Sequence, residues 1–169
     1  MILGMSISAF TTFHVVLSLI GIFAGLVVLF GMLGSRKLEG WTALFLATTV
    51  LTSVTGFPFP RDHILPSHIV GVISLIVLAI AIFALYAGHL AGSWRWIYVV
   101  TAIVALYFNV FVAVVQAFAK IPLLHNFAPT QSEPPFIIAQ AVVLIAFIAL
   151  GVNAIISFHP ASASSLRPV

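Results

Sequence analysis

Residues 57–73 read Phe-Pro-Phe-Pro-Arg-Asp-His-Ile-Leu-Pro-Ser-His-Ile-Val-Gly-Val-Ile and separate two long apolar runs. Proline lacks a backbone N–H and ends helices, so the prolines of this stretch predict a helix boundary. Charged and ionisable side chains gather here although 5% of the chain is charged: Arg61, Asp62, His63 and His68. The stretch therefore divides the chain into helices and is the first place to expect a functional site.

The composition of the whole chain identifies an integral membrane protein. Of its 169 residues, 63% are hydrophobic and 5% are charged, whereas about a quarter of a soluble domain is charged. The six Lys and Arg residues are scattered, so the net charge of +3 forms no basic surface and we expect no nucleic-acid partner. The absence of cysteine excludes disulfides, thiolate metal sites and cysteine nucleophiles. The lipid bilayer is the partner that this composition predicts.

Five apolar runs have about the length that crosses a bilayer, for which about 20 helical residues are needed. They lie near residues 9–33, 41–57, 67–90, 95–119 and 135–157. The second run is the shortest, and Pro58 and Pro60 end it abruptly. The sequence thus predicts an all-α, polytopic membrane bundle of five transmembrane helices. Residues 1–159 are expected to form one transmembrane domain, followed by a flexible cytoplasmic tail over 160–169.

Five spans place the two termini on opposite sides of the membrane. Cytoplasmic loops carry the excess of Lys and Arg, which predicts the orientation. Four basic residues fall on the carboxyl-terminal side and two on the other: Arg36, Lys37, Arg95 and Arg167 against Arg61 and Lys120. We therefore expect a bacterial-type inner membrane, with the amino terminus outside and the tail in the cytoplasm. The first run carries no Lys or Arg at its amino end, so it is expected to be a retained helix and not a signal peptide.

Polar side chains recur at about the same depth on the outer side of all five predicted helices. These residues are His14, Ser53 with Thr55, His68, Gln116 and Gln140. His14 shares a helical stripe with Gly21 and Gly25, a small-residue face along which membrane helices pack closely. We therefore expect His14 to point into the bundle. The same glycine face would also suit a second copy of the chain or another membrane protein.

An ionisable group inside a membrane helix indicates a functional site. We predict that His14 and His68 face each other about one turn beneath the outer surface, with Gln116 and Gln140 as inner partners that help to bind a cofactor. The predicted rim of the site consists of loop residues: Asp62, His63, His125 and Glu133. Because imidazole and carboxylate ligands together suit Zn, Cu, Fe or Mn, the first interpretation is a site for a transition metal or redox cofactor.

Other interpretations stay open. Haem b is held in helix bundles by histidines on facing helices, an arrangement that His14 and His68 would satisfy. An apolar bundle with 15 Phe residues also suits a quinone or a lipid head group near its outer rim. Short loops and glycine-rich faces are equally typical of a non-catalytic accessory subunit, in which the polar residues make interhelical hydrogen bonds worth about 0.6 to 2 kcal/mol each. No transferable catalytic motif occurs, so the sequence does not decide whether the protein is an enzyme.

Overall fold

The computed structural model describes residues 4–59 and 66–160, with the backbone alone for residues 66–68. Asp62 and His63 thus lie outside the described residues, as do the side chain of His68 and the predicted tail beyond residue 160. The described chain forms helices α1 (Ile7–Leu33), α2 (Glu39–Thr55), α3 (Pro66–Ile82) with a π-helical extension η1 (Phe83–Ala87), α4 (Ser93–Lys120), α5 (Pro122–Phe127) and α6 (Pro134–Ser157). The short α5 was not expected, and Pro122 at its first turn favours it because that position needs no N–H.

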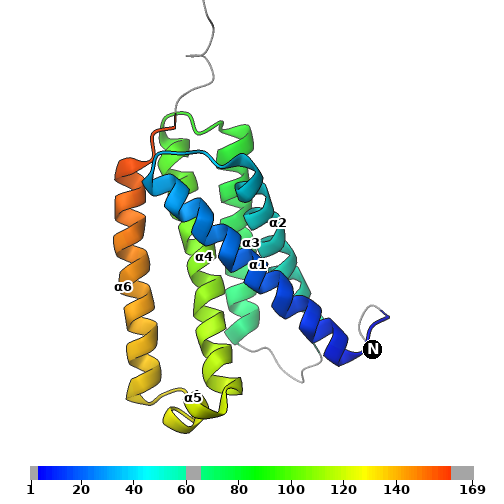
Figure 1. Ribbon diagram of the computed structural model, residues 1–169. Helices are drawn as coiled ribbons and strands as arrows, with labels where there is room; N and C mark the ends of the chain where they lie inside the picture. The colour runs from blue at the N-terminus through cyan, green and yellow to red at the C-terminus, as the bar shows by residue number, and fades with distance from the viewer. Residues whose placement is uncertain (1–3, 60–65, 161–169) are drawn as a thin grey trace, which may run out of the picture.

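The long helices alternate in direction along the bundle (Figure 1). The starts of α1, α3 and α6 lie at one end together with α5, and this end is called the amino end below. The starts of α2 and α4 and the last turn of α6 lie at the other end, called the carboxyl end. The first and last described helices therefore begin and finish at opposite ends of the bundle.

Four helices are long and apolar enough to cross a membrane: α1, α3 with η1 (Ile69–Ala87), α4 and α6. The helical membrane bundle is therefore confirmed, but with four candidate spans where the sequence predicted five. The predicted span that is not among these four is the second, residues 41–57, which corresponds to α2 and has 17 residues. At 1.5 Å per residue such a helix is about 25 Å long, shorter than the hydrocarbon core of about 30 Å.

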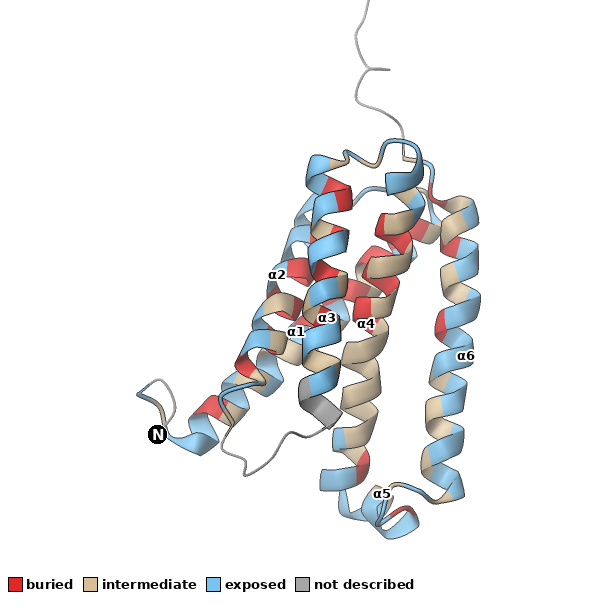
Figure 2. Cartoon of the chain, turned by 180° about the vertical axis from the view of Figure 1, so that it is seen from behind, coloured by how far each residue is buried: buried red, intermediate tan, exposed pale blue. Residues whose placement is uncertain are grey.

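The hydrophobic core lies in the carboxyl-end half of the bundle. It joins the second halves of α1, α3 and α6 to the first halves of α2 and α4, with buried members such as Leu29, Phe45, Leu78, Leu106 and Ala154. Buried positions gather in that half in Figure 2. Toward the amino end, α1 and α6 lean apart (Figures 1 and 2). Residues 107–115 of α4 are consequently only half-buried.

Glycines let α1 approach α2 and α4 closely. A Cβ added to Gly25 would lie 2.5 Å from Leu106 Cδ1 and 2.9 Å from Phe45 Cδ2. One added to Gly21 would lie 3.2 Å from the hydroxyl oxygen of Thr48. Both glycines are buried within the chain, so their face is already covered by α2 and α4. A second copy or a partner protein would need a different surface.

The substitution Gly25→Ala should lower the free energy of unfolding by about 1–3 kcal/mol, the usual cost of overpacking a core. Leu106 and Phe45 are each 1% exposed, so neither side chain has free space into which it could move. Thermal unfolding in detergent measures the change. Gly40→Ala is the matched control, because an added Cβ there meets nothing within 4 Å. Equal stability of the two variants would contradict the close approach at Gly25.

Candidate functional site

His14 lies half-buried on α1 and is held by the last turn of α2. Its Nδ1 is 2.8 Å from Thr55 Oγ1. The Thr55 hydroxyl donates its proton to the backbone carbonyl of Leu51 at 2.7 Å. A hydroxyl has one proton to donate, so both short contacts of Thr55 are hydrogen bonds when His14 Nδ1 carries the hydrogen, and we assign that tautomer. The Nε2 atom of His14 then keeps its lone pair and can accept a hydrogen bond or ligate a metal.

Aromatic rings also border His14. The Phe59 ring meets the imidazole edge-on, with 5.4 Å between the ring centroids. Phe10 packs against Phe59 at 5.2 Å and is itself fully buried. His14 Cε1 also approaches Gly56, the residue that caps α2, at 3.8 Å from the position of an added Cβ. The imidazole therefore contacts both the end of α2 and the aromatic ring of Phe59.

A threonine stripe lines the buried face of α2: Thr42, Thr48, Thr49, Thr52 and Thr55. Near the middle of the bundle, Asn109 Nδ2 of α4 donates to Thr49 Oγ1 at 3.2 Å. Gly21 of α1 lies directly beside Thr48 and Thr49. The sequence interpretation included Thr55 but missed the stripe as a whole. Its signal is the helical spacing: Thr52 follows Thr48 and Thr49 by four and three residues, Thr55 follows Thr52 by three, and Thr49 follows Thr42 by seven, the periodicity of one helix face.

Gln116 and Gln140, the predicted inner partners, make no hydrogen bond to His14 in the described part of the chain. Gln116 is exposed, because the amino-end half of α4 is left uncovered where α1 and α6 lean apart. Gln140 Nε2 donates to the backbone carbonyl of Phe111 at 3.2 Å and so ties α6 to α4. Gln131 makes the same kind of bond to the carbonyl of Val115 at 2.9 Å. The Gln140 bond is an interhelical hydrogen bond of the kind that the accessory-subunit interpretation expected, whereas Gln131 bonds to α4 from the loop before α6.

Glu133, predicted at the rim, is bound by its own loop. Its carboxylate accepts hydrogen bonds from the Thr130 backbone at 3.1 Å, the Thr130 hydroxyl at 2.8 Å and the Ser132 backbone at 3.1 Å. Desolvation raises the pKa of Glu133, but these hydrogen bonds together lower it more, so its net pKa lies below the ordinary value. The carboxylate thus organises the start of α6.

His125, the other described rim residue, is exposed on α5. Because α5 lies beside α4 and α6, it is on the far side of the bundle from the first turns of α1 (Figures 1 and 2). Among the residues whose side chains are described, no three His, Asp or Glu residues come together to hold a metal. Asp62, His63 and the imidazole of His68 fall outside those residues. The predicted pairing of His14 with His68 therefore stays a prediction.

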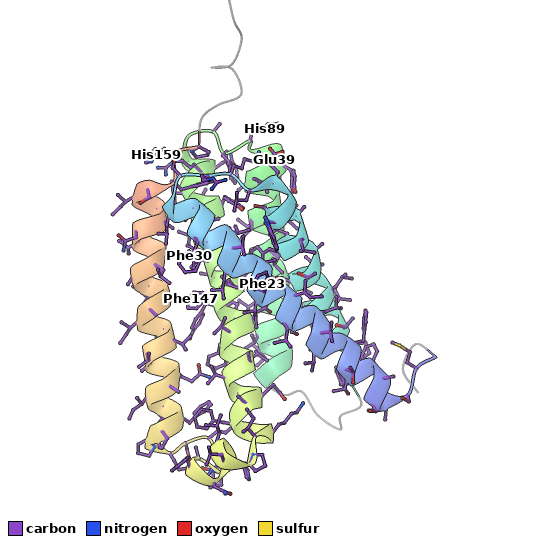
Figure 3. The ribbon with its side chains drawn as sticks, viewed as in Figure 1. Phe23, Phe30, Glu39, His89, Phe147 and His159 are labelled. Carbon is purple, nitrogen blue, oxygen red and sulfur yellow. The ribbon has the colours of Figure 1, made fainter. Side chains whose placement is uncertain are left out.

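The carboxyl end carries a separate polar group with a structural role. Arg95 Nη1 donates to the carbonyls of Ile155 at 3.0 Å and Phe158 at 2.7 Å, and thereby caps the last turn of α6. The backbone N–H of His159 donates to Ser35 Oγ at 2.9 Å, which ties the end of α6 to the α1–α2 connection. Figure 3 shows His89 and His159 at this end of the bundle, away from the start of α1.

Three comparisons of the chain with known proteins found no match. No protein-family model matches the sequence, and neither the curated proteins nor the solved structures give a match. The chain is a helical membrane bundle by its fold.

The tautomer of His14 is directly testable. Neutral His14 should carry its proton on Nδ1, which ¹⁵N chemical shifts of the histidine ring report in bilayer samples. Thr55→Val removes the acceptor and should shift the proton toward Nε2. Thr101→Val is the control, since the Thr101 hydroxyl donates only to carbonyls of its own helix among the described contacts. An Nε2-protonated His14 in the unmodified chain would disprove the assignment.

Proposed function

We propose that the chain is a membrane-embedded protein that binds a transition metal or redox cofactor through His14 Nε2 at the amino end of the bundle. The hydrogen bond from His14 Nδ1 to Thr55 is the observation that carries this proposal. A metal-bound histidine almost always donates its other ring N–H to an acceptor, which orients the ring and raises its basicity. Thr55 supplies that acceptor from the neighbouring helix.

His68 is the proposed second ligand. Its helix is joined to α2 by a hydrogen bond of 3.3 Å from Ser53 Oγ to Ser74 Oγ. Farther toward the amino end, a Cβ on Gly71 would lie 3.2 Å from the Phe57 ring. His68 is three residues earlier in the antiparallel α3, so its backbone is about level with Phe59, the residue whose ring contacts His14. This backbone register supports a site shared by the two helices.

Haem iron is the cofactor that needs the fewest further ligands here. Haem would be held by one or two imidazoles in an apolar surround, of which His14 would give one imidazole and Phe10 and Phe59 part of the surround. A haem bound there would supply one-electron transfer. A site for Zn, Cu, Fe or Mn alone would need more ligands, for which Asp62 and His63 are the proposed donors. A quinone with its carbonyl near His14 is a further possibility of the same site.

An accessory subunit is the second candidate, and α6 favours it. Within the described structure, α6 buries Phe147 and Ala154 and exposes apolar side chains along the rest of its length. Ile145 and Ile156 are 65% and 67% exposed. Lipid covers such a surface in an isolated subunit, and a partner helix would cover it in a complex. An accessory subunit needs no bound cofactor, so the presence or absence of a cofactor distinguishes it from the first candidate function.

The proposed topology has five crossings, with the amino terminus outside the inner membrane. Support comes from α2, which runs back from the carboxyl end to the amino end beside α1 (Figure 1). Its threonine stripe faces protein and not lipid, which suits a short and more polar crossing. Arg36, Lys37 and Arg95 lie at the carboxyl end and Lys120 at the other, so the positive-inside rule assigns the carboxyl end to the cytoplasm.

Cysteine labelling tests this topology in a chain that has no cysteine of its own. In intact cells, an impermeant maleimide should react with Thr130→Cys and not with Ser35→Cys. The reverse pattern would overturn the orientation. Protection of both positions in intact cells, with labelling after lysis, would show that α2 does not cross.

The cofactor is tested by a visible spectrum and elemental analysis of the detergent-purified protein. The expected result is a Soret band or a stoichiometric transition metal that is lost in His14→Ala and in His68→Ala. His159→Ala should retain the bound species, because this histidine lies at the opposite end of the bundle. Thr55→Val should weaken binding roughly 10- to 100-fold, the usual effect of removing a partner of a ligand. An unoccupied protein, or full occupancy in His14→Ala, would favour the accessory subunit.

A further inference from the structure

The hydroxyl of Thr52 differs from those of its neighbours on α2. Thr48 and Thr55 each donate to the carbonyl four residues earlier, at 2.7 Å. Such back-bonding is the usual solution for a threonine inside an apolar helix. Thr52 is 9% exposed, and within the described part of the chain its buried Oγ1 has no hydrogen-bond partner. A buried polar group of this kind calls for a partner.

The packing of α1 against α2 shows what lies level with Thr52. The two helices run antiparallel, with His14 beside Thr55 and Gly21 beside Thr48 and Thr49. The α1 residues between those two contacts include Ser18, which is therefore about level with Thr52. The Ser18 hydroxyl donates to the His14 carbonyl at 3.0 Å and keeps its lone pairs for a further donor. Ser18 of α1 thus brings a second hydroxyl group to the level of Thr52, on the helix that faces α2.

The spacing of these groups suits bridging water. Threonines three residues apart on one helix are separated by about 4.5 Å along its axis. A direct hydrogen bond between hydroxyls is about 2.7 Å long, so Thr49, Thr52 and Thr55 are too far apart to bond one another. One water with two hydrogen bonds spans about 5 Å and needs two or more polar partners, which this stripe offers at each turn.

On the carboxyl-end side of Asn109, apolar side chains fill the interface of α1 with α2 and α4. At Gly25 the side chains of Leu106 and Phe45 come so near that an added Cβ would lie 2.5 Å and 2.9 Å from them. Both side chains are almost completely buried and have no hydrogen-bonding atoms. Water has neither room nor partners there, so a polar path from His14 ends at the Asn109–Thr49 hydrogen bond.

We propose that the interface of α1, α2 and α4 binds a short file of water molecules that runs from His14 past Thr52 to Asn109. This file gives protons access from the amino end to the middle of the bundle, and the Phe45–Leu106 contact stops them there. The pathway is therefore a closed half-channel, which hydrates the interior without conducting protons across the membrane. It does not depend on a cofactor at His14.

Solid-state NMR of the unmodified chain in lipid bilayers tests the file by transferring magnetisation from water to protein. Transfer should reach the side chains of Thr52 and Asn109 about as fast as those of exposed loop residues. It should not reach Ala105, which is fully buried on α4 one turn beyond Asn109. Transfer to Thr52 as slow as that to Ala105 would overturn the proposal.

Substitution of Thr52 provides the second measurement. In Thr52→Val the hydroxyl is lost with little change of shape, so transfer to Asn109 should fall to the level of Ala105 while transfer to Thr55 persists. Thr52→Ser keeps the hydroxyl and should keep the transfer to Asn109, which separates loss of water from loss of folding. Unchanged transfer to Asn109 in Thr52→Val would show that the water does not pass Thr52.

Discussion

The close contact of α1 with α2 and α4 at Gly25 determines much of the remaining structure. A side chain there would collide with Leu106 and Phe45, so the glycine allows the helices to approach at this level. Membrane helices gain little from hiding apolar surface from lipid, and close packing of small residues is a principal source of their association. The contact also sets the register of the antiparallel pair. That register places Gly21 beside Thr49 and His14 beside Thr55.

Packing differs strongly between the two halves of the bundle. The carboxyl-end half is filled by leucine, phenylalanine and alanine from five helices, and Arg95 closes it by capping α6. In the amino-end half α1 and α6 lean apart, and His14, Thr55 and Thr52, on which the proposals rest, lie on the amino-end parts of α1 and α2. A tightly packed half thus adjoins a half with more polar groups, and a packed support of this kind is what the proposed site would need to hold its side chains in place.

The hydrogen bonds of the α2 stripe follow from its surroundings. Hydrocarbon offers no partners, so polar groups inside a membrane bundle must be satisfied by the protein or by enclosed water. Thr48 uses its own helix, Thr49 uses Asn109, and Thr55 bonds both its own helix and His14. Thr52 stands apart because the described residues give it no partner. The assignment of the His14 tautomer and the proposed water file both come from this accounting.

The sequence by itself determined the membrane class, the helical architecture and the helix boundaries to within a few residues, as for α6 at Pro134–Ser157 against a prediction of 135–157. These properties depend on composition and on local breaks such as Pro58 and Pro60, which act without tertiary contacts. The sequence also placed His14, Gln116 and Gln140 at one depth, but only the tertiary structure shows the surroundings of each: His14 bonds Thr55, Gln140 bonds the Phe111 carbonyl, and Gln116 is exposed. Depth is a coordinate along the helix axis, whereas neighbours depend on how helices tilt and rotate. Where α1 leans away from α6, Gln116 is left exposed, and the packing of α1 against α2 brings His14 within hydrogen-bond distance of Thr55.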